Sequence, residues 1–313
     1  MCSGIRFCAS WAWAEDDMER IKEALEKARE ARAHASEGAR DPNQPKALKT
    51  KGGKEVDQLE YTRTRTVKVS RDFLREQRII SGFEQGILTE AYKMLRTLVL
   101  QKMRENGWNA LAVTSPGGGE GKTLTAINLA ISLAMEVDQT VLLVDADLRH
   151  PQMRQYFGLP DGPGLSDYLT KGTPLEEILV HPDIVGRFVL LPGGQPLQNS
   201  PEMLRSPKMV DLVQELKGRY PSRIVLFDLS PVLSVADVLA FSPYVDAALL
   251  VVEEAKTKME DITRAASLLG STHLIGTVLN KSLGTVPNKS LEPDARSKTP
   301  SSWIKRFFRR NEG

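Results

Sequence analysis

Residues 113–123 read VTSPGGGEGKT, a glycine-rich run that ends in Lys122 and Thr123 and continues the apolar stretch ALAVT at 110–114. Glycines let backbone N–H groups turn toward phosphate oxygens, and the N-terminus of a following helix adds partial positive charge. Pro116 occupies the first glycine position of the G-x4-G-K-[S/T] pattern, so the match is incomplete. We nevertheless predict a phosphate-binding loop in preference to a flexible turn, with nucleotide contacts from Gly117, Gly118, Gly119, Glu120, Gly121, Lys122, Thr123 and Leu124.

Apolar runs alternate with amphipathic segments from about residue 108 onward. TVLLVDAD at 140–147 has the character of a buried strand, whereas TLTAINLAISLAMEV at 123–137 has helical periodicity. Strands separated by helices form a parallel sheet that is covered on both faces. We therefore predict a doubly wound, mostly parallel α/β fold of the P-loop NTPase type, with strands at 110–114, 140–147, 187–191, 223–228, 247–253 and 274–280.

Carboxylates follow two of these predicted strands. The segment DADLR places Asp145 and Asp147 at positions i and i+2, so that both side chains point to the same side of the strand end. RIVLFD places Asp228 at the end of another apolar run. Ligands bind at the carboxyl ends of strands in such sheets, so these acids are expected near the glycine-rich loop. The alternative for each, taken alone, is a solvated turn.

Composition changes along the chain predict its organisation. Residues 1–17 are a candidate for an over-called translation start, because the helical pattern MERIKEALEKAREA begins at Met18. A helix is predicted at 18–35 and a polar flexible linker at 36–58. The nucleotide-binding domain is expected at 59–282, and a flexible tail at 283–313.

The overall charge and cysteine content narrow the class of protein. A net charge of +2 gives no general field for nucleic acid, and no stretch approaches the length of apolar residues that would span a membrane. The two cysteines, Cys2 and Cys8, leave the rest of the chain without thiols, which fits a reducing compartment. We expect a cytoplasmic location and no nucleic-acid partner.

The end of the tail has its own pattern at 303–310. Its aromatic and aliphatic residues recur at i, i+1, i+4 and i+5, and basic residues fill the positions between them. A short basic amphipathic helix of this kind can lie on an anionic membrane surface. The alternatives are a disordered basic end or a patch docked on the domain. The residues concerned are Trp303, Ile304, Lys305, Arg306, Phe307, Phe308, Arg309 and Arg310.

Three motifs together resemble the bacterial tyrosine kinases that control capsule and exopolysaccharide synthesis, of the CpsD/CapB type. They are SPGGGEGKT, LLVDADLRHP and VLFDLSPV. The resemblance runs from about 59 to 282 and includes TEAYKMLRT and GTVLNK, and the N-terminal helix is similar to members linked to exosortase-type systems. It implies a MinD-like fold and an ATP- and Mg²⁺-dependent protein-tyrosine autokinase, a transferase that regulates polysaccharide polymerisation and export.

The resemblance also implies roles for single residues. Lys122 and Thr123 would be the Walker A pair, and Asp145 the base or orienting group for a tyrosine hydroxyl. Asp147 and Asp228 would complete a magnesium site with Thr123. Two further residues, Arg149 and Asn280, would belong to the nucleotide site, where Asn280 would bind adenine.

Self-association and further partners are implied in the same way. Glu90, Lys93 and Arg96 match the E-x-x-R-x-x-R helix through which family members assemble into rings, with lysine in place of the middle arginine. The alternative is a solvated charged helix face. The resemblance also implies a transmembrane polysaccharide co-polymerase (a Wzz-like chain-length determinant) as partner, and a place at the inner face of the cell membrane.

One feature departs from the family. Its members carry a C-terminal tyrosine cluster, but here the last tyrosine is Tyr244. Tyr61, in a segment expected to be extended, is the most mobile acceptor that the sequence offers. The alternative function is a membrane-recruited MinD/ParA-like ATPase switch or scaffold without kinase activity. That group has a lysine at the position of Gly117, which disfavours it.

Overall fold

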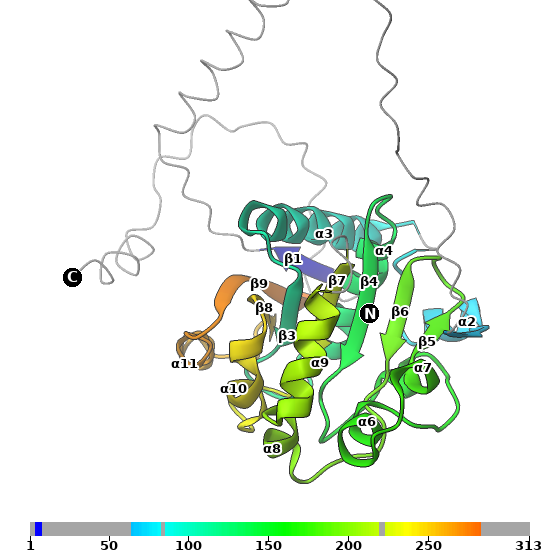
Figure 1. Ribbon diagram of the computed structural model, residues 1–313. Helices are drawn as coiled ribbons and strands as arrows, with labels where there is room; N and C mark the ends of the chain where they lie inside the picture. The colour runs from blue at the N-terminus through cyan, green and yellow to red at the C-terminus, as the bar shows by residue number, and fades with distance from the viewer. Residues whose placement is uncertain (1–3, 8–63, 83–84, 219–222, 283–313) are drawn as a thin grey trace, which may run out of the picture. The chain divides into compact units, whose positions relative to one another are not determined.

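The computed structural model describes residues 4–7, 64–82, 85–218 and 223–282 (Figure 1). The chain divides into two units, Met1–Leu283 and Gly284–Gly313, and every described residue belongs to the first. The predicted helix at 18–35, the linker at 36–58 and the tail at 283–313 lie outside the described residues. These three remain predictions.

Nine strands of the described chain form one sheet in the order β1-β9-β8-β3-β7-β4-β6-β5-β2. Neighbouring strands from β9 to β6 are parallel, whereas β1 with β9 and β5 with β6 are antiparallel pairs. The mostly parallel sheet confirms the predicted fold class. The strands are β1 Gly4–Phe7, β2 Arg65–Val67, β3 Ala110–Thr114, β4 Thr140–Asp145, β5 Val180–Pro182, β6 Phe188–Leu191, β7 Arg223–Asp228, β8 Ala247–Glu253 and β9 His273–Ser282.

The six predicted strands all form, and three of them (β3, β7 and β8) have the predicted bounds. β4 is two residues shorter than predicted because the chain turns after Asp145. Sequence patterns did not predict β1 or β5 as strands. Each is at most four residues long, so neither carries enough residues to show a period.

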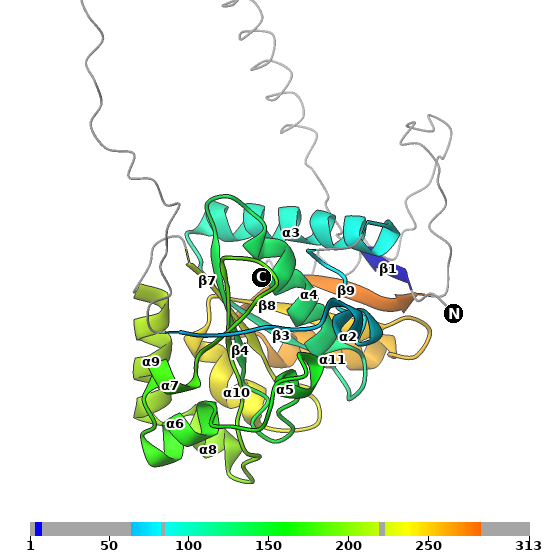
Figure 2. The same cartoon turned by 90° about the vertical axis from the view of Figure 1, so that its right-hand side faces the viewer.

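Helices connect the strands and cover both faces of the sheet. Figures 1 and 2 show α9 on one side of the central strands and α4, beneath α3, on the other. The helices are α2 Arg71–Glu76, α3 Ile87–Asn106, α4 Lys122–Ala134, α5 Met153–Tyr156, α6 Leu165–Lys171, α7 Leu175–Ile178, α8 Ser200–Leu204, α9 Pro207–Gly218, α10 Asp237–Phe241, the 3₁₀ turn η1 Ser242–Tyr244 and α11 Met259–Leu268.

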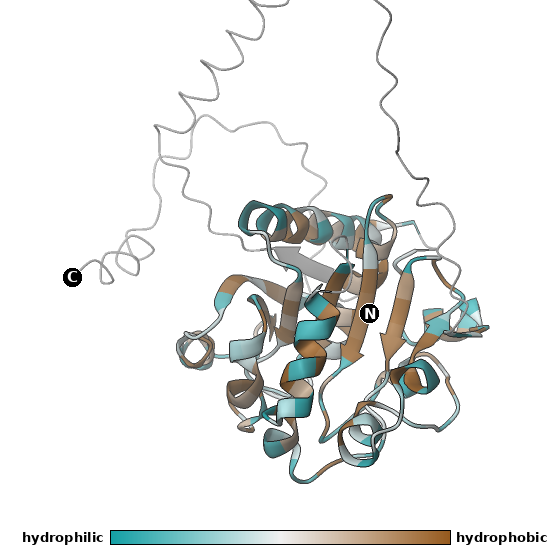
Figure 3. Cartoon of the chain, viewed as in Figure 1, coloured by the Kyte–Doolittle hydropathy of each residue, from teal (hydrophilic) through white to brown (hydrophobic). Residues whose placement is uncertain are grey.

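The sheet separates two hydrophobic cores, because successive side chains of a strand point to opposite faces. Leu111 and Val113 of β3 pack with the buried faces of α3 and α4. Ala110 and Ala112 of the same strand pack with α9 and α10. Burial on both faces explains why the central strands are apolar between their ends, as the brown strands of Figure 3 show.

A polar side chain inside apolar helix α4 holds a distant segment in place. Asn128 is fully buried, and its Oδ1 accepts hydrogen bonds from the backbone N–H groups of Ile80 (2.9 Å) and Ser81 (3.1 Å). Its Nδ2 donates to the carbonyls of Arg78 and Leu124, each at 3.1 Å. Four backbone groups are thereby satisfied by one amide. This fixes residues 78–81 beside the N-terminal half of α4, where the glycine-rich loop ends.

Candidate functional site

The glycine-rich loop joins the end of β3 to the first residue of α4. Gly119 and Gly121 have φ angles of +77° and +93°, a region that other residues rarely adopt. A Cβ atom on Gly121 would also lie 2.1 Å from Nδ2 of Asn280, far inside van der Waals contact. Both the backbone angle and the close approach therefore require glycine before Lys122.

Lys122 faces carboxylates from two strand ends. Its Nζ lies 2.8 Å from Asp147 Oδ2 and 3.6 Å from Asp228 Oδ1. The hydroxyl of Thr123 donates to Asp228 Oδ2 at 2.6 Å. Ser230 donates to the other oxygen of Asp147 at 2.7 Å. The structure thus brings together four of the residues that the sequence predicted: the lysine, the threonine and two acids.

Burial and charge shift the pKa values in this cluster. Burial by itself would lower the pKa of Lys122, but the charges of Asp228 and Asp147 outweigh it and raise the pKa above its ordinary value. Burial raises the pKa of Asp228 to about 6, although Lys122 and the Thr123 hydroxyl act in the opposite direction. Lys122 therefore stays charged and ready to attract an anion.

Asp145 is buried behind this cluster, at the point where β4 ends. Its Oδ2 accepts the backbone N–H groups of Gln152 (3.1 Å) and Met153 (3.0 Å), at the start of α5. Within the described part of the chain, Oδ1 has no hydrogen-bond partner. Burial, followed by the charge of Asp228, raises the pKa of Asp145 to about 7. Burial and the nearby charge of Asp228 therefore favour the protonated form of the Asp145 carboxyl.

A cavity of about 570 Å³ opens beside the loop. Of the predicted nucleotide and metal residues, those that line it are Gly118, Gly119, Gly121, Lys122, Thr123, Leu124, Asp147 and Asn280. Asp145 and Asp228 are not among its lining residues, since both side chains are buried. The cavity is large enough for a small organic ligand.

Three predicted nucleotide residues, Gly117, Glu120 and Arg149, bind their own chain and are not among the residues that line the cavity. Glu120 is buried, with Oε2 accepting the N–H of Gly117 (3.1 Å) and Oε1 accepting the hydroxyl of Thr257 (2.5 Å). Arg149 donates from Nε to Asp237 on α10 at 3.1 Å. A direct contact of either side chain with a nucleotide stays a prediction.

Sequence analysis did not find several residues of the cavity wall. Tyr156, Arg78 and Lys281 line it. The first two come from segments without a motif, whereas Lys281 ends the GTVLNK motif, in which only Asn280 was given a role. The sequence does hold a signal for the segment of Arg78. Asn128 lies within the apolar run of α4, which indicates a buried polar contact, and its Nδ2 donates to the carbonyl of Arg78. Lys281 directly follows Asn280 and has a φ of +56°, which the sequence does not reveal.

The oxygen atoms of the cluster suit a magnesium ion. Thr123, Asp147 and Asp228 offer a hydroxyl and two carboxylates, the hard ligands that Mg²⁺ prefers. Oδ1 of Asp228 accepts no hydrogen bond from the described residues. No group of three or more His, Cys, Asp or Glu side chains in that part of the chain is arranged to hold a metal by itself. Phosphate oxygens usually supply the missing ligands at such sites.

The predicted contact helix is α3. Glu90 and Lys93 form an exposed ion pair of 2.7 Å on its surface. Arg96, by contrast, binds within its own chain: Nε pairs with Glu136 at 2.8 Å and Nη1 donates to the carbonyl of Ser132 at 3.1 Å. The exposed residues Ile87 and Met94 lie on the same helix.

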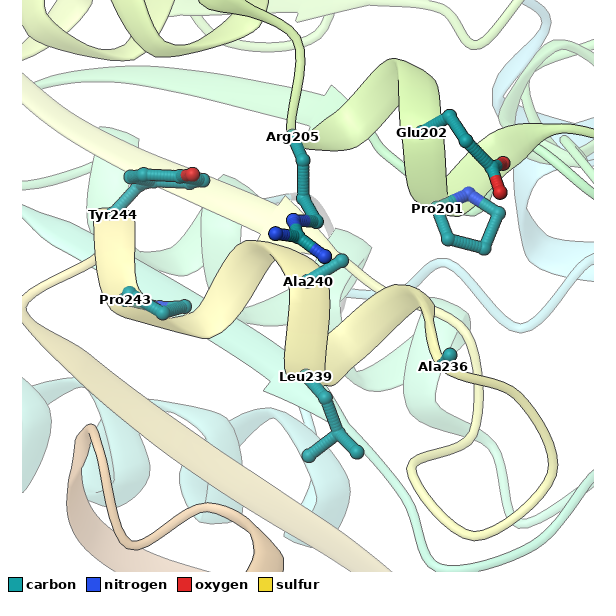
Figure 4. Close-up of a pocket in the computed structure, with 8 residues that line it drawn as sticks. All are labelled: Pro201, Glu202, Arg205, Ala236, Leu239, Ala240, Pro243 and Tyr244. Carbon is teal, nitrogen blue, oxygen red and sulfur yellow. The ribbon is translucent and has the colours of Figure 1, made fainter.

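A second hollow of about 620 Å³ lies between α8 and α10 (Figure 4). Arg205, which follows α8, and Leu239 and Ala240 of α10 are among the residues that line it. None of the predicted site residues lines this hollow. The phosphate loop is therefore the better candidate for the functional site.

The family comparison agrees with this geometry. Residues 111–305 match the model of the CobQ/CobB/MinD/ParA nucleotide binding domain. The match covers more than half of the chain and includes the loop, the acids after β4 and β7, and the end of β9. The chain thus belongs to this class of nucleotide-binding P-loop proteins.

Within this class of nucleotide-binding proteins, individual relatives of the chain carry the names of tyrosine-protein kinases. The tyrosine-protein kinase YwqD of Bacillus subtilis is 32% identical over 198 residues, which are 63% of this chain and 82% of YwqD. A protein of Ralstonia solanacearum named "Putative tyrosine-protein kinase EpsB" is 34% identical over 173 residues, or 55% of this chain. The chain spans 22% of the length of EpsB.

A solved structure agrees with these relatives. The kinase domain of the Escherichia coli tyrosine kinase ETK superposes with a TM-score of 0.60 at 25% identity. The superposition covers 72% of this chain and 93% of that domain. The chain is a member of the bacterial tyrosine-protein kinase family.

The buried Asp145 predicts a pH dependence of stability in the metal-free protein. Folded Asp145 stays protonated up to about pH 7, whereas the unfolded carboxyl ionises near its ordinary value of about 4. The folded state therefore binds more protons over this range. Its stability should fall as the pH rises from about 4 to 7, by at most about 1.4 kcal/mol per pH unit for one proton.

Urea denaturation in EDTA at several pH values measures this slope. Asp145→Asn should make it shallower, because the amide does not titrate, and the slope that remains comes from Asp228, whose pKa is raised as well. Asp138→Asn, which removes an exposed carboxylate after α4, should keep the wild-type slope. An unchanged slope in Asp145→Asn would contradict the assignment.

Proposed function

We propose that this chain is an ATP-dependent protein-tyrosine kinase. One observation carries the proposal: Lys122 stands between the carboxylates of Asp147 and Asp228 at a phosphate loop, in a member of a tyrosine-kinase family. Phosphoryl transfer depends on positioning and charge neutralisation more than on covalent chemistry. Lys122, the loop N–H groups and the helix dipole of α4 supply both.

We propose Thr123, Asp147 and Asp228 as the protein ligands of Mg²⁺. The ion would neutralise charge on the β- and γ-phosphates of ATP. Thr123 and Asp228 already share a hydrogen bond, so the hydroxyl and the carboxylate are held side by side. Lys122 would exchange its pairing with Asp147 for contact with phosphate oxygens, which releases that carboxylate toward the metal.

Asp145 is our candidate for the group that orients the acceptor tyrosine and takes its proton. Its raised pKa suits proton transfer near neutral pH. Its Oδ2 is bound to the start of α5, so the acceptor has to approach Oδ1 or α5 has to shift. Tyr156, the last residue of α5, already lines the cavity.

An ATPase switch or scaffold is the second candidate. It is favoured by the absence of any tyrosine after Tyr244 in the sequence. It is disfavoured by Gly117, which stands where the MinD/ParA group has a lysine. In either case we propose a role in exopolysaccharide or capsule production, beside a Wzz-like transmembrane co-polymerase at the inner face of the membrane. Among the described residues, no helix has the length and apolarity needed to cross a bilayer.

Incubation with Mg-ATP, followed by phosphosite mapping with mass spectrometry, tests the kinase proposal. The wild-type protein should acquire phosphotyrosine, and the mapped site names the acceptor. Lys122→Met should lose it because phosphate binding fails, and Asp145→Asn should reduce the rate by about 10²-fold or more because a general base is removed. ATP hydrolysis without phosphotyrosine, with the partner's cytoplasmic segment present, would establish the switch instead.

Self-association through α3 is the second proposal that needs a test. The exposed pair Glu90 and Lys93, with Ile87 and Met94 beside it, is the surface we propose for the contact. Ile87→Glu combined with Met94→Glu should shift the mass measured by light scattering toward the monomer. Val137→Glu, an exposed position after α4, is the control and should keep the wild-type mass.

Membrane docking through residues 303–310 is proposed from the sequence alone, because this segment lies outside the described residues. A variant that ends at residue 301 should float less with vesicles that contain anionic lipid than the full chain does. The difference should shrink at high salt, since the attraction is electrostatic. Equal flotation of the two proteins would exclude this role for the tail.

A further inference from the structure

Two carbonyl groups of the phosphate loop are bound by the end of β9. Nζ of Lys281 donates to the carbonyl of Gly119 at 2.7 Å, and Nδ2 of Asn280 donates to the carbonyl of Glu120 at 2.9 Å. These partners are more than 150 residues apart in the chain. Adjacent residues of β9 thus hold adjacent peptide groups of the loop.

Binding a carbonyl also fixes the neighbouring N–H. A trans peptide is planar, and its C=O and N–H point in opposite directions. The carbonyl of Gly119 shares a peptide with the N–H of Glu120, and the carbonyl of Glu120 shares one with the N–H of Gly121. Because both carbonyls point toward β9, both N–H groups face away from it. N–H groups that point to one side form an anion-binding nest.

Lys281 and Asn280 are themselves held in place. Oδ1 of Asn280 accepts the N–H of Lys281 at 2.8 Å, which supports the positive φ of Lys281. Nζ of Lys281 also lies 3.1 Å from Glu253 at the end of β8. The hydroxyl of Thr257 accepts the N–H of Glu253 (2.9 Å) and donates to the Glu120 side chain. The loop is thus held at the carbonyls of Gly119 and Glu120 and at the side chain of Glu120.

We infer that Lys281 and Asn280 are positioning residues, which orient the phosphate-loop peptides so that the N–H groups of Glu120 and Gly121 are available to phosphate oxygens. The inference rests on the proposed nucleotide site, but not on transfer to tyrosine. It gives Asn280 a role different from the adenine contact that the family resemblance implies, since both polar atoms of its amide bind within the chain.

Calorimetric titration with Mg-ATP and with magnesium tripolyphosphate separates the two roles of Asn280. Tripolyphosphate carries the phosphates without a base or ribose. Asn280→Ala should weaken the binding of both probes, by about tenfold, because the Glu120 carbonyl loses its donor. Weaker binding of ATP with unchanged binding of tripolyphosphate would overturn the inference for Asn280 and establish a base contact.

Lys281 is tested with the same probes. Lys281→Met keeps the length of the side chain without the donor and should weaken both probes by about tenfold. Lys281→Arg restores a donor and should recover most of the affinity. Lys256→Met is the matched control, because Lys256 donates to the same Glu253 oxygen at 3.0 Å, whereas the hydrogen bond to the loop carbonyl comes from Lys281. It should bind as the wild type does.

The outcomes also separate this inference from the proposed kinase activity. Each variant should melt in one cooperative transition without ligand, which shows that it folds. A wild-type protein that binds both probes but forms no phosphotyrosine would contradict only the kinase proposal. Lys281→Met that binds tripolyphosphate as tightly as Lys256→Met would overturn the positioning role. Failure of the wild type to bind either probe would overturn both.

Discussion

The site depends on one ammonium group held among buried carboxylates. Lys122 lies within 4 Å of Asp147 and Asp228, and Asp145 lies close enough to contribute to its charge balance. Leaving any of these charges without a partner would be strongly unfavourable at this burial. The cluster exists because β4 and β7 are neighbours in register, with Asp145 opposite Asp228, and because α4 begins beside them. Negative charge in excess at such a place favours a metal ion and repels bare phosphate, so nucleotide and magnesium suit it together.

The conformation of the phosphate loop depends on contacts from other segments and not only on its own residues. Its glycines permit many conformations, and flexibility alone would cost affinity on binding. The contacts from Asn280, Lys281 and Thr257 select one conformation before a ligand arrives. Residues 78–81, fixed by Asn128, then close a further wall of the cavity. The loop is therefore preorganised for its ligand by residues that lie far from it in the sequence.

The hydrophobic cores supply the rigidity that this arrangement needs. Strands buried on both faces hold the carboxyl ends of β3, β4 and β7 at fixed separations. The site sits where those ends meet α4, the usual position for ligands in open α/β sheets. Arg149, bound to Asp237 on α10, ties the segment after β4 to the second core. The segment that carries Asp145 and Asp147 is thus held by α5, which binds Asp145, and by α10, which binds Arg149.

The sequence by itself determined the fold class, the six main strands, the phosphate loop and the acids Asp145, Asp147 and Asp228, because period, glycines and strand-end charges are local signals. Only the tertiary structure decided which way each side chain points. It turned Glu120 and Arg149 toward their own chain, buried Asp145 under α5, and brought Tyr156 and Lys281 to the cavity wall. Those outcomes depend on partners distant in sequence, such as Asp237 for Arg149 or Thr257 for Glu120. No local pattern encodes such pairings, since they arise from the order of strands in the sheet.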